Sequence, residues 1–186
     1  MAINKKEMLV ESLLKLCSIQ SLEQITISSL LKDTGMSRQT FYNYFKDKND
    51  LIQYVYTSRI VDDFNGDFDN FIFYDAILRA LKNMQNYHHF MKQACLMNDQ
   101  NCLKDYIFNH CLDFDIQWHS YLYGKEMDDT MLLVTRYHSL ASSSMTLSWI
   151  LSDCSMEAEL IAQLIVDMRS VGMNMLGHQN PYRQIL

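Results

Sequence analysis

Apolar and polar residues alternate with a helical period near the start of the chain. From residue 3 to residue 19, apolar side chains recur every three or four positions, and lysines and glutamates lie between them. The apolar positions include Met8, Leu9, Leu13, Leu16 and Cys17. This spacing places one side of an α-helix against a core, so the segment is predicted to form an amphipathic helix.

Three shorter helices are expected next. Thr26 is a suitable N-cap for a helix that ends at Gly35, because glycine often ends helices in the left-handed conformation. Ser37 is a suitable N-cap for a second helix over residues 38–45. A further helix is predicted from about Asn49 to about residue 65.

Longer amphipathic segments fill the rest of the chain. They cover about 74–86, 88–98, 101–123, 129–152 and 156–176, with breaks at Gly66, Gly124 and residues 153–155. The residues after Gly177 are expected to be a frayed end. The pattern therefore predicts about nine helices, four short ones followed by five longer ones.

The composition narrows the fold class to all-α. The chain has 186 residues, of which only 5 are glycine and 1 is proline, while 48% are hydrophobic. Turns and sheet corners need glycine and proline, so this scarcity disfavours sandwiches, barrels and Rossmann-type folds. The hydrophobic fraction is sufficient for a real core.

The lack of a recognisable targeting signal and the pattern of cysteines predict a cytoplasmic protein. The N-terminal segment has no uninterrupted apolar run typical of a secretory signal, and no run reaches the roughly 18 residues needed to span a bilayer. We therefore expect no contact with a membrane. The five cysteines include no CxxC pair, so buried thiols are expected in a reducing compartment.

Two short helices joined by a turn with Gly35 make a helix-turn-helix. On a helical wheel, Phe41 and Phe45 share the inward face of the second helix. Gln39, Thr40 and Asn43 fall on the opposite face, where such side chains can contact base edges in a major groove.

Other polar side chains flank this face. Tyr42 and Tyr44 are placed to contact phosphates on either side of a groove, and Ser37, Lys46 and Lys48 lie at its ends. The alternative is a solvated surface helix that packs on a hydrophobic neighbour. Helix-turn-helix shapes also occur in proteins that bind no DNA.

The segment TISSLLKDTGMSRQTFYNYF resembles the signature of the TetR/AcrR family of bacterial transcription regulators. The matching positions are Thr26, Ile27, Leu30, Gly35, Met36, Ser37, Thr40, Phe41, Tyr42, Tyr44, Phe45, Lys48 and Leu51. RQTFYNYF and a later WIL segment further resemble the subgroup that includes the activator of dihydroxyacetone kinase operons. Ser29 departs from the family because it replaces the usual acidic capping residue, which is expected to weaken that cap.

The resemblance implies a role for each matching residue. Tyr42, Tyr44 and Lys48 would hold phosphates. Thr26 and Ser28 would reach the neighbouring DNA backbone. The residues expected to approach bases are Arg38, Gln39, Thr40 and Asn43.

The net charge of −6 disfavours DNA as a partner only when the chain is taken as a whole. Residues 1–58 contain seven basic and six acidic side chains, a net charge of +1. The remaining residues contain nine basic and sixteen acidic side chains, a net charge of −7. We therefore expect a DNA-binding domain over residues 1–48 and an acidic helical domain over residues 49–186 that binds an effector and forms a dimer.

The last two long helices have an apolar face suited to association. The residues expected there are Leu140, Ser144, Leu147, Leu151, Leu160, Leu164 and Met168. Internal core packing is the alternative interpretation. In the family that the chain resembles, these helices form a four-helix dimer bundle, which implies a homodimer on a near-palindromic operator.

The middle helices are rich in aromatic, methionine and histidine residues, which could line an effector pocket. The candidates are Tyr87, Met91, Tyr106, His110, Trp118 and Tyr137. Core packing is again the alternative for each of them. A protein partner is the alternative signal if the pocket is small.

Other chemistries are less favoured by the sequence. Cysteines and histidines cluster between residues 88 and 119, but their spacing does not match a zinc site, so a metal or thiol redox sensor is the lesser alternative. The chain has no P-loop, GxGxxG, GxSxG or HExxH motif. Asp113 and Asp115 lie on different faces of one helix and are not expected to act as a pair.

These observations predict a transcription regulator rather than an enzyme, with no cofactor and no resident metal. We expect a repressor that a small-molecule effector releases from double-stranded DNA. The alternative is an activator or co-regulator of the same fold that is controlled by a protein partner.

Overall fold

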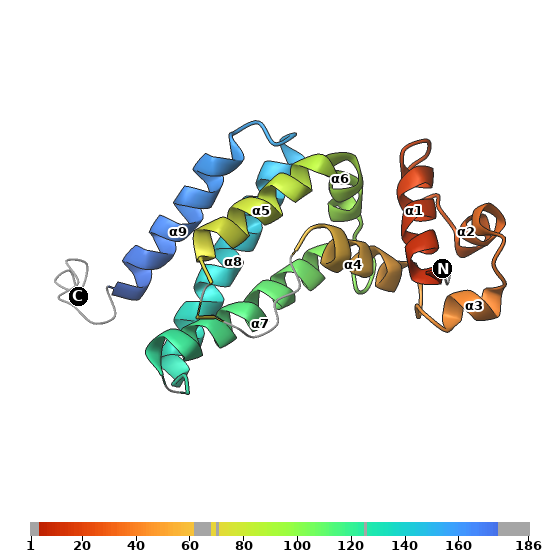
Figure 1. Cartoon of the computed structure of the whole chain (residues 1–186). Coiled ribbons are helices and arrows are strands. Elements are labelled where there is room, and N and C mark those ends of the chain that lie inside the picture. Colours follow the sequence, from red (N-terminus) through yellow and green to blue (C-terminus); the bar gives the residue numbers. More distant parts are fainter. Residues whose placement is uncertain (1–3, 62–67, 70, 125, 175–186) are drawn as a thin grey trace.

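The computed structural model describes residues 4–61, 68–69, 71–124 and 126–174, and every regular element within these ranges is a helix (Figure 1). The all-α prediction is confirmed. The predicted break at Gly66 and the tail after Gly177 lie outside the described residues.

Nine helices follow one another in the described part of the chain. They are α1 (Lys5–Cys17), α2 (Ile27–Thr34), α3 (Arg38–Tyr42), α4 (Lys48–Arg59), α5 (Phe73–Asn86), α6 (His88–Leu96), α7 (Leu103–Tyr123), α8 (Asp129–Leu151) and α9 (Ala158–Asn174). Their order agrees with the prediction. Two of them are shorter than predicted, because α3 ends at Tyr42 rather than at residue 45 and α4 ends at Arg59.

The first three helices form one end of the molecule, at the right in Figure 1. Their shared interior contains Leu9 and Leu13 of α1, Leu30 of α2, and Phe41 and Phe45 of the α3 segment, all of them buried. The apolar periodicity that predicted these helices therefore also predicted their packing.

The start of α2 corrects one expectation. The Thr26 hydroxyl accepts the Ser29 amide at 3.1 Å, and the Ser29 hydroxyl accepts the Thr26 amide at 3.0 Å. This is a complete capping box in which serine replaces the usual acid. The prediction that Ser29 weakens the cap was wrong, because the short hydroxyl reaches the same amide.

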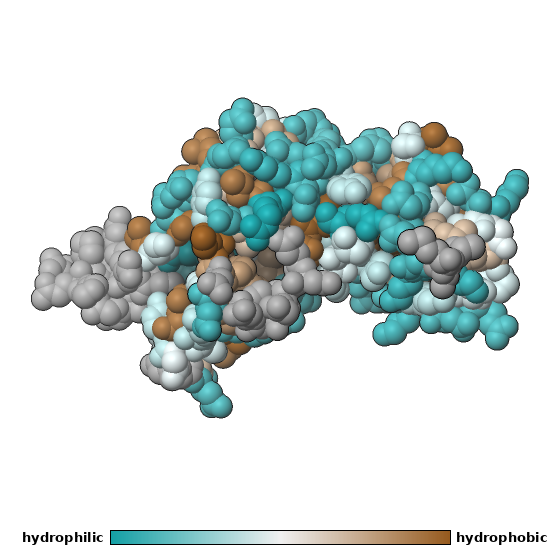
Figure 2. All heavy atoms as spheres, viewed as in Figure 1, coloured by the Kyte–Doolittle hydropathy of each residue, from teal (hydrophilic) through white to brown (hydrophobic). Residues whose placement is uncertain are grey.

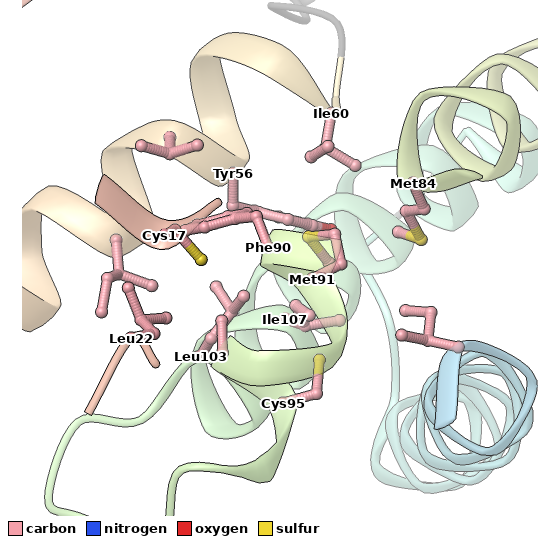
Figure 3. Packing of buried hydrophobic residues seen from close by; sticks show 14 of the residues in the cluster. Cys17, Leu22, Tyr56, Ile60, Met84, Phe90, Met91, Cys95, Leu103 and Ile107 are labelled. Atoms are coloured by element: carbon pink, nitrogen blue, oxygen red, sulfur yellow. The ribbon is translucent and has the colours of Figure 1, made fainter. Parts of the chain in front are cut away.

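Helices α5 to α9 form the larger part of the molecule, with α7 packed on α8 and α5 packed on α9 (Figure 1). The buried residues form one continuous core that runs from α1 to α9. In Figure 3, Tyr56 of α4 extends toward Met91 of α6, close to Ile107 of α7. No described helix is long and apolar enough to cross a bilayer.

Helix α4 and the α1–α2 loop attach the first three helices to the rest of the chain. Asn49 donates to the Asp99 carboxylate at 2.9 Å, and Gln53 donates to the Asn101 carbonyl at 2.8 Å, both in the loop before α7. Gln93 of α6 accepts the Leu22 amide at 2.5 Å. The joint therefore includes several exposed or part-buried hydrogen bonds.

Candidate DNA-binding surface and internal cavity

The turn between α2 and α3 is set by two residues. Gly35 has a φ of 69°, the left-handed conformation in which glycine is favoured. Ser37 then caps α3, because its hydroxyl accepts the Thr40 amide at 3.1 Å. The predicted helix-turn-helix is therefore present.

Helix α3 presents a polar face to solvent. Arg38, Gln39 and Asn43 are exposed, whereas Phe41 and Phe45 are buried and their ring centroids lie 5.9 Å apart. Thr40 is only half-buried, and its hydroxyl lies 2.9 Å from that of Ser37. The predicted division between an inner and an outer face is confirmed.

The two tyrosines lie at the edges of this face. Tyr42 is 48% exposed and Tyr44 is 38% exposed. The Tyr42 ring meets the Phe41 ring edge to face with a centroid distance of 5.5 Å, which fixes its position. Among the described residues, neither hydroxyl has a hydrogen-bond partner, so both are available to a ligand outside the protein.

The remaining predicted contacts differ in how far they are available. Lys46 and Ser28 are exposed. The Thr26 and Ser37 hydroxyls already accept the capping amides of α2 and α3. On the face shown in Figure 2, hydrophilic side chains cover most of this end of the molecule.

Lys48 is placed differently from the prediction. Its Nζ atom donates to the carbonyl oxygens of Leu22, Ile25 and Glu23 at 3.0, 3.0 and 3.1 Å. An ammonium group has three donors, so all of them are used inside the protein. Burial also lowers the pKa of Lys48. In this structure Lys48 thus fixes the α1–α2 loop, and its contact with a phosphate stays a prediction.

A cavity of about 400 Å³ lies among the helices of the second part of the chain. Its lining residues are Tyr56, Val61, Phe71, Phe73, Ala76, Ile77, Arg79, Ala80, Leu81, Met84, Ile107, His110, Cys111, Phe114, Asp115, Ser142, Ser143, Thr146, Ile165 and Arg169. The volume is in the range of small-molecule sites, and most of the lining is apolar.

Of the six predicted pocket residues, only His110 lines this cavity. Met91 is buried in the core, and Tyr137 is 67% exposed. Trp118 packs against Phe73 with a ring-centroid distance of 6.2 Å. The prediction failed for these residues because aromatic content does not show which side of a helix faces the interior.

Tyr87 and Tyr106 also lie outside the lining. Tyr87 forms the junction between α5 and α6, where its backbone caps both helices. Tyr106 lies against the lining from outside and stacks on His110 with a centroid distance of 6.1 Å.

An ion pair that the sequence did not reveal lies in the cavity wall. Arg169 of α9 donates to the Asp115 carboxylate of α7, and both residues are buried. The Ser139 hydroxyl donates to the other Asp115 oxygen, and Arg169 donates to the Ser142 hydroxyl at 3.2 Å. Asp113 is exposed, so the prediction that it does not act with Asp115 agrees with the geometry.

Apart from the Asp115–Arg169 ion pair, burial shifts the pKa of several histidines and cysteines in and around the cavity toward their neutral forms. Desolvation lowers the pKa of His110, His119 and His138. It raises the pKa of the Cys111 thiol to about 11 and that of the Cys95 thiol to about 12. Thiols with such a pKa are poor nucleophiles and poor redox sensors. Within the described ranges, no three His, Cys, Asp or Glu side chains gather around a point that could hold one metal ion.

An apolar stripe lies on the outer surface of α8 and α9. Leu140 is 49% exposed and Met168 is 60% exposed, with Ser144 and Leu160 also exposed. Leu147, Leu164 and Leu151 lie along the same stripe with partial exposure. These seven residues are the ones predicted to form the dimer interface. Leu147 also packs against the core, whereas the exposed members of the set are not simply internal core.

Comparison with known proteins places this fold among transcription regulators. No protein-family model matches the sequence. The HTH-type dhaKLM operon transcriptional activator DhaS of Lactococcus lactis subsp. lactis is 23% identical over 76% of this chain and 76% of its own length.

Solved structures share the whole architecture. The dihydroxyacetone kinase operon activator DhaS aligns with a TM-score of 0.70 and 16% identity, over 94% of this chain and 98% of its own. A TetR-family transcriptional regulator from Streptomyces coelicolor aligns with a TM-score of 0.55 and 21% identity, over 94% of this chain and 83% of its own. The fatty acid degradation regulator FadR from Bacillus halodurans aligns with a TM-score of 0.58 and 15% identity, over 95% of this chain and 100% of its own. The chain shares its fold with these three proteins, which are named as an operon activator, a TetR-family transcriptional regulator and a fatty acid degradation regulator.

Proposed function

We propose that this chain regulates transcription by binding double-stranded DNA through α3. The observation that carries the proposal is the outer face of α3, where Arg38, Gln39 and Asn43 are exposed beside a correctly capped helix-turn-helix. Amide and guanidinium side chains contact base edges in the major groove. The TetR-type fold supports the same function.

The flanking side chains are proposed to position the protein on the DNA backbone. Tyr42 and Tyr44 have exposed rings with unused hydroxyls, and Lys46 carries a free positive charge. Ser28 is exposed at the start of α2 and lies on the same end of the molecule. Such phosphate contacts give affinity and orientation without reading the sequence. Lys48 has no part in this set because its donors are used internally.

A homodimer is the proposed active form. Positions 140, 144, 147 and 151, of which 147 is half-buried and the others are exposed, follow a spacing of three and four residues along α8. This is the spacing of helices that pack against each other. Leu160, Leu164 and Met168 extend the stripe onto α9. Two copies joined here would present two α3 helices to successive major-groove faces of a near-palindromic site.

Control by a small-molecule effector is proposed through α4. Tyr56 of α4 lines the cavity, and the same helix begins at Lys48, which holds the loop before α2. A ligand that binds one arrangement of α4 better would shift the population of DNA-competent dimers. A repressor that leaves DNA when the cavity fills is the simplest such regulator.

Activation is the second candidate, and one observation favours it. Both DhaS proteins to which this chain is similar are named as activators of a dihydroxyacetone kinase operon. In that case the DNA-bound form would stimulate transcription, and a protein partner would control it in place of a small molecule.

The binding proposal is tested by retardation of a promoter fragment taken from beside the protein's own gene, at low salt. Saturable retardation is expected. Transcription of the same promoter in vitro, with and without the protein, then distinguishes a repressor from an activator.

A further inference from the structure

The cavity has one polar wall in an otherwise apolar lining. Phe71, Phe73 and Phe114 contribute aromatic rings, while the polar wall comes mainly from α8 and α9. Within that wall, the Asp115 carboxylate accepts from Arg169 and from Ser139. The ligand must therefore match a mostly apolar surface with a small polar contribution.

The charges of this wall cancel. Asp115 and Arg169 pair with each other, and the Arg169 guanidinium also lies 5.0 Å from the centroid of the Phe73 ring. Burial lowers the pKa of His110, which keeps that ring neutral near pH 7. Arg79 is the other charged lining residue, and it is exposed with interactions of its own. A charged ligand would thus enter a site whose buried charges are already satisfied, at a high desolvation cost.

Two hydroxyls in the lining have no nitrogen or oxygen partner among the described residues. The Ser143 hydroxyl is buried and forms no hydrogen bond to any nitrogen or oxygen of the described residues. Its polar neighbour is the Cys111 thiol, a weak hydrogen-bonding group. The Tyr56 hydroxyl also forms no hydrogen bond within the described ranges, although its ring packs against Tyr106 and His110. Buried polar groups are normally hydrogen-bonded, so an orphaned hydroxyl in a cavity points to a ligand atom.

These two hydroxyls belong to different helices. Ser143 lies on α8, which carries the apolar stripe, and Tyr56 lies on α4, which is attached to the DNA-binding end. Both residues line the same cavity, and Cys111 of α7 lines it with them. A ligand in this cavity therefore meets both α8 and α4.

We propose that the cavity binds an uncharged, mainly apolar small molecule whose one hydroxyl or carbonyl group hydrogen-bonds to Ser143 and Tyr56. The apolar body of the ligand fills the region lined by Phe71, Phe73 and Phe114. This inference deepens the proposed function by giving the chemical class of the effector. It rests on the proposed function only for the consequence that binding has for DNA.

Calorimetric titration of the full chain without DNA tests the proposal with three related probes. The probes are 2-naphthol, which is neutral at pH 7 and has a hydroxyl, naphthalene, which has no polar group, and 2-naphthoate, which is anionic. One saturable 2-naphthol site per chain is expected. Naphthalene is expected to bind about three- to tenfold more weakly, the effect of one hydrogen bond, and 2-naphthoate more weakly than 2-naphthol.

Two variants and their matched controls locate the site. Ser143→Ala and Tyr56→Phe each remove one hydroxyl and are expected to weaken 2-naphthol binding about three- to tenfold. Ser170→Ala and Tyr54→Phe make the same chemical changes outside the cavity, on α9 and α4, and should leave the affinity unchanged. Melting temperatures of all four variants show whether each one is folded.

Three outcomes would overturn the proposal: absence of saturable 2-naphthol binding up to its solubility limit, equal or tighter binding of 2-naphthoate, or unchanged affinity in both Ser143→Ala and Tyr56→Phe. Because these titrations contain no DNA, their failure leaves the DNA-binding proposal untouched. Failure of DNA binding alone would likewise leave the ligand site intact.

Discussion

Asp115 on α7 and Arg169 on α9, which are 54 positions apart in the sequence, form a buried ion pair that joins the two helices. Both groups have further partners, since Ser139 donates to the carboxylate and Ser142 accepts from the guanidinium. The pair therefore ties α7, α8 and α9 together at the cavity. Removing either charge alone would leave the other one buried without compensation.

Replacement of Arg169 tests this relationship. Arg169→Met should lower the free energy of unfolding by about 3–5 kcal/mol, because the Asp115 carboxylate loses its counter-charge in the interior. The double variant Asp115→Leu/Arg169→Met should recover most of the loss. Denaturant unfolding followed by circular dichroism measures both. The exposed pair Lys82–Glu159 is the control, and Glu159→Gln should change stability little. Equal stability of Arg169→Met and the wild type would contradict a structural role.

Lys46 and Lys48 are a matched pair with different expected roles. Lys48→Met should lower the free energy of unfolding by about 2 kcal/mol, because three backbone carbonyls lose a charged donor. Lys46→Met should leave stability unchanged and weaken binding to all DNA sequences, with the salt slope reduced by about 1. Unfolding and fluorescence anisotropy at several salt concentrations give the two readouts. An unchanged stability of Lys48→Met with a reduced salt slope would restore the phosphate role predicted from the sequence.

Two buried histidines, His119 and His138, and the half-buried His110 make stability depend on pH. Burial lowers the pKa of His110, His119 and His138 below the ordinary value of 6.5. Between that value and the lower pKa of the folded state, the unfolded chain binds more protons, so the free energy of unfolding falls as pH falls. This contribution is complete above pH 6.5 and is lost below it.

Denaturant midpoints at pH 7.5 and pH 5.5 measure the effect. His119→Gln should have a smaller difference between the two midpoints than the wild type, whatever its absolute stability. Three carboxylates with lowered pKa values do not affect this comparison, because their contribution to the free energy of unfolding is lost only below about pH 4.5. They are Asp33, Asp153 and Glu159. A wild-type denaturant midpoint that is higher at pH 5.5 than at pH 7.5 would contradict the predicted loss of stability at lower pH.

The apolar stripe gives a test of the oligomeric state. Leu140→Glu places a charge in the proposed interface and should convert a dimer into a monomer at micromolar concentration, measured by sedimentation. Leu96→Glu is the matched control, because Leu96 is also exposed but lies on α6, away from the stripe. A wild-type protein that sediments as a monomer would overturn the homodimer proposal.

The local part of the structure was predictable because it depends on residues close together in the sequence. Periodicity and caps predicted the helix order, and the wheel of α3 predicted which side chains are exposed. The features that the sequence did not predict depend on contacts between distant residues. The carbonyls that hold Lys48 belong to residues 22–25, and nothing in the periodicity brings them to it.

The cavity was the least predictable feature. Its polar wall depends on Asp115 and Arg169, which are joined only by the packing of three helices. The aromatic residues chosen from the sequence lie partly in the core and partly on the surface, as Met91 and Tyr137 show. A signal was nevertheless present, because a charged residue on the apolar face of a helix requires a buried partner.

The central claim is that α3 reads DNA, and fluorescence anisotropy on a site selected from random duplexes tests it most directly. The account predicts enrichment of a near-palindromic sequence. Tyr42→Phe should weaken binding to the selected and a scrambled duplex by similar factors, whereas Asn43→Ala should weaken mainly the selected one. Asn109→Ala, at an exposed position on α7, is the control and should change neither. Failure to enrich any sequence, or equal losses on both duplexes for Asn43→Ala and Tyr42→Phe, would contradict the account.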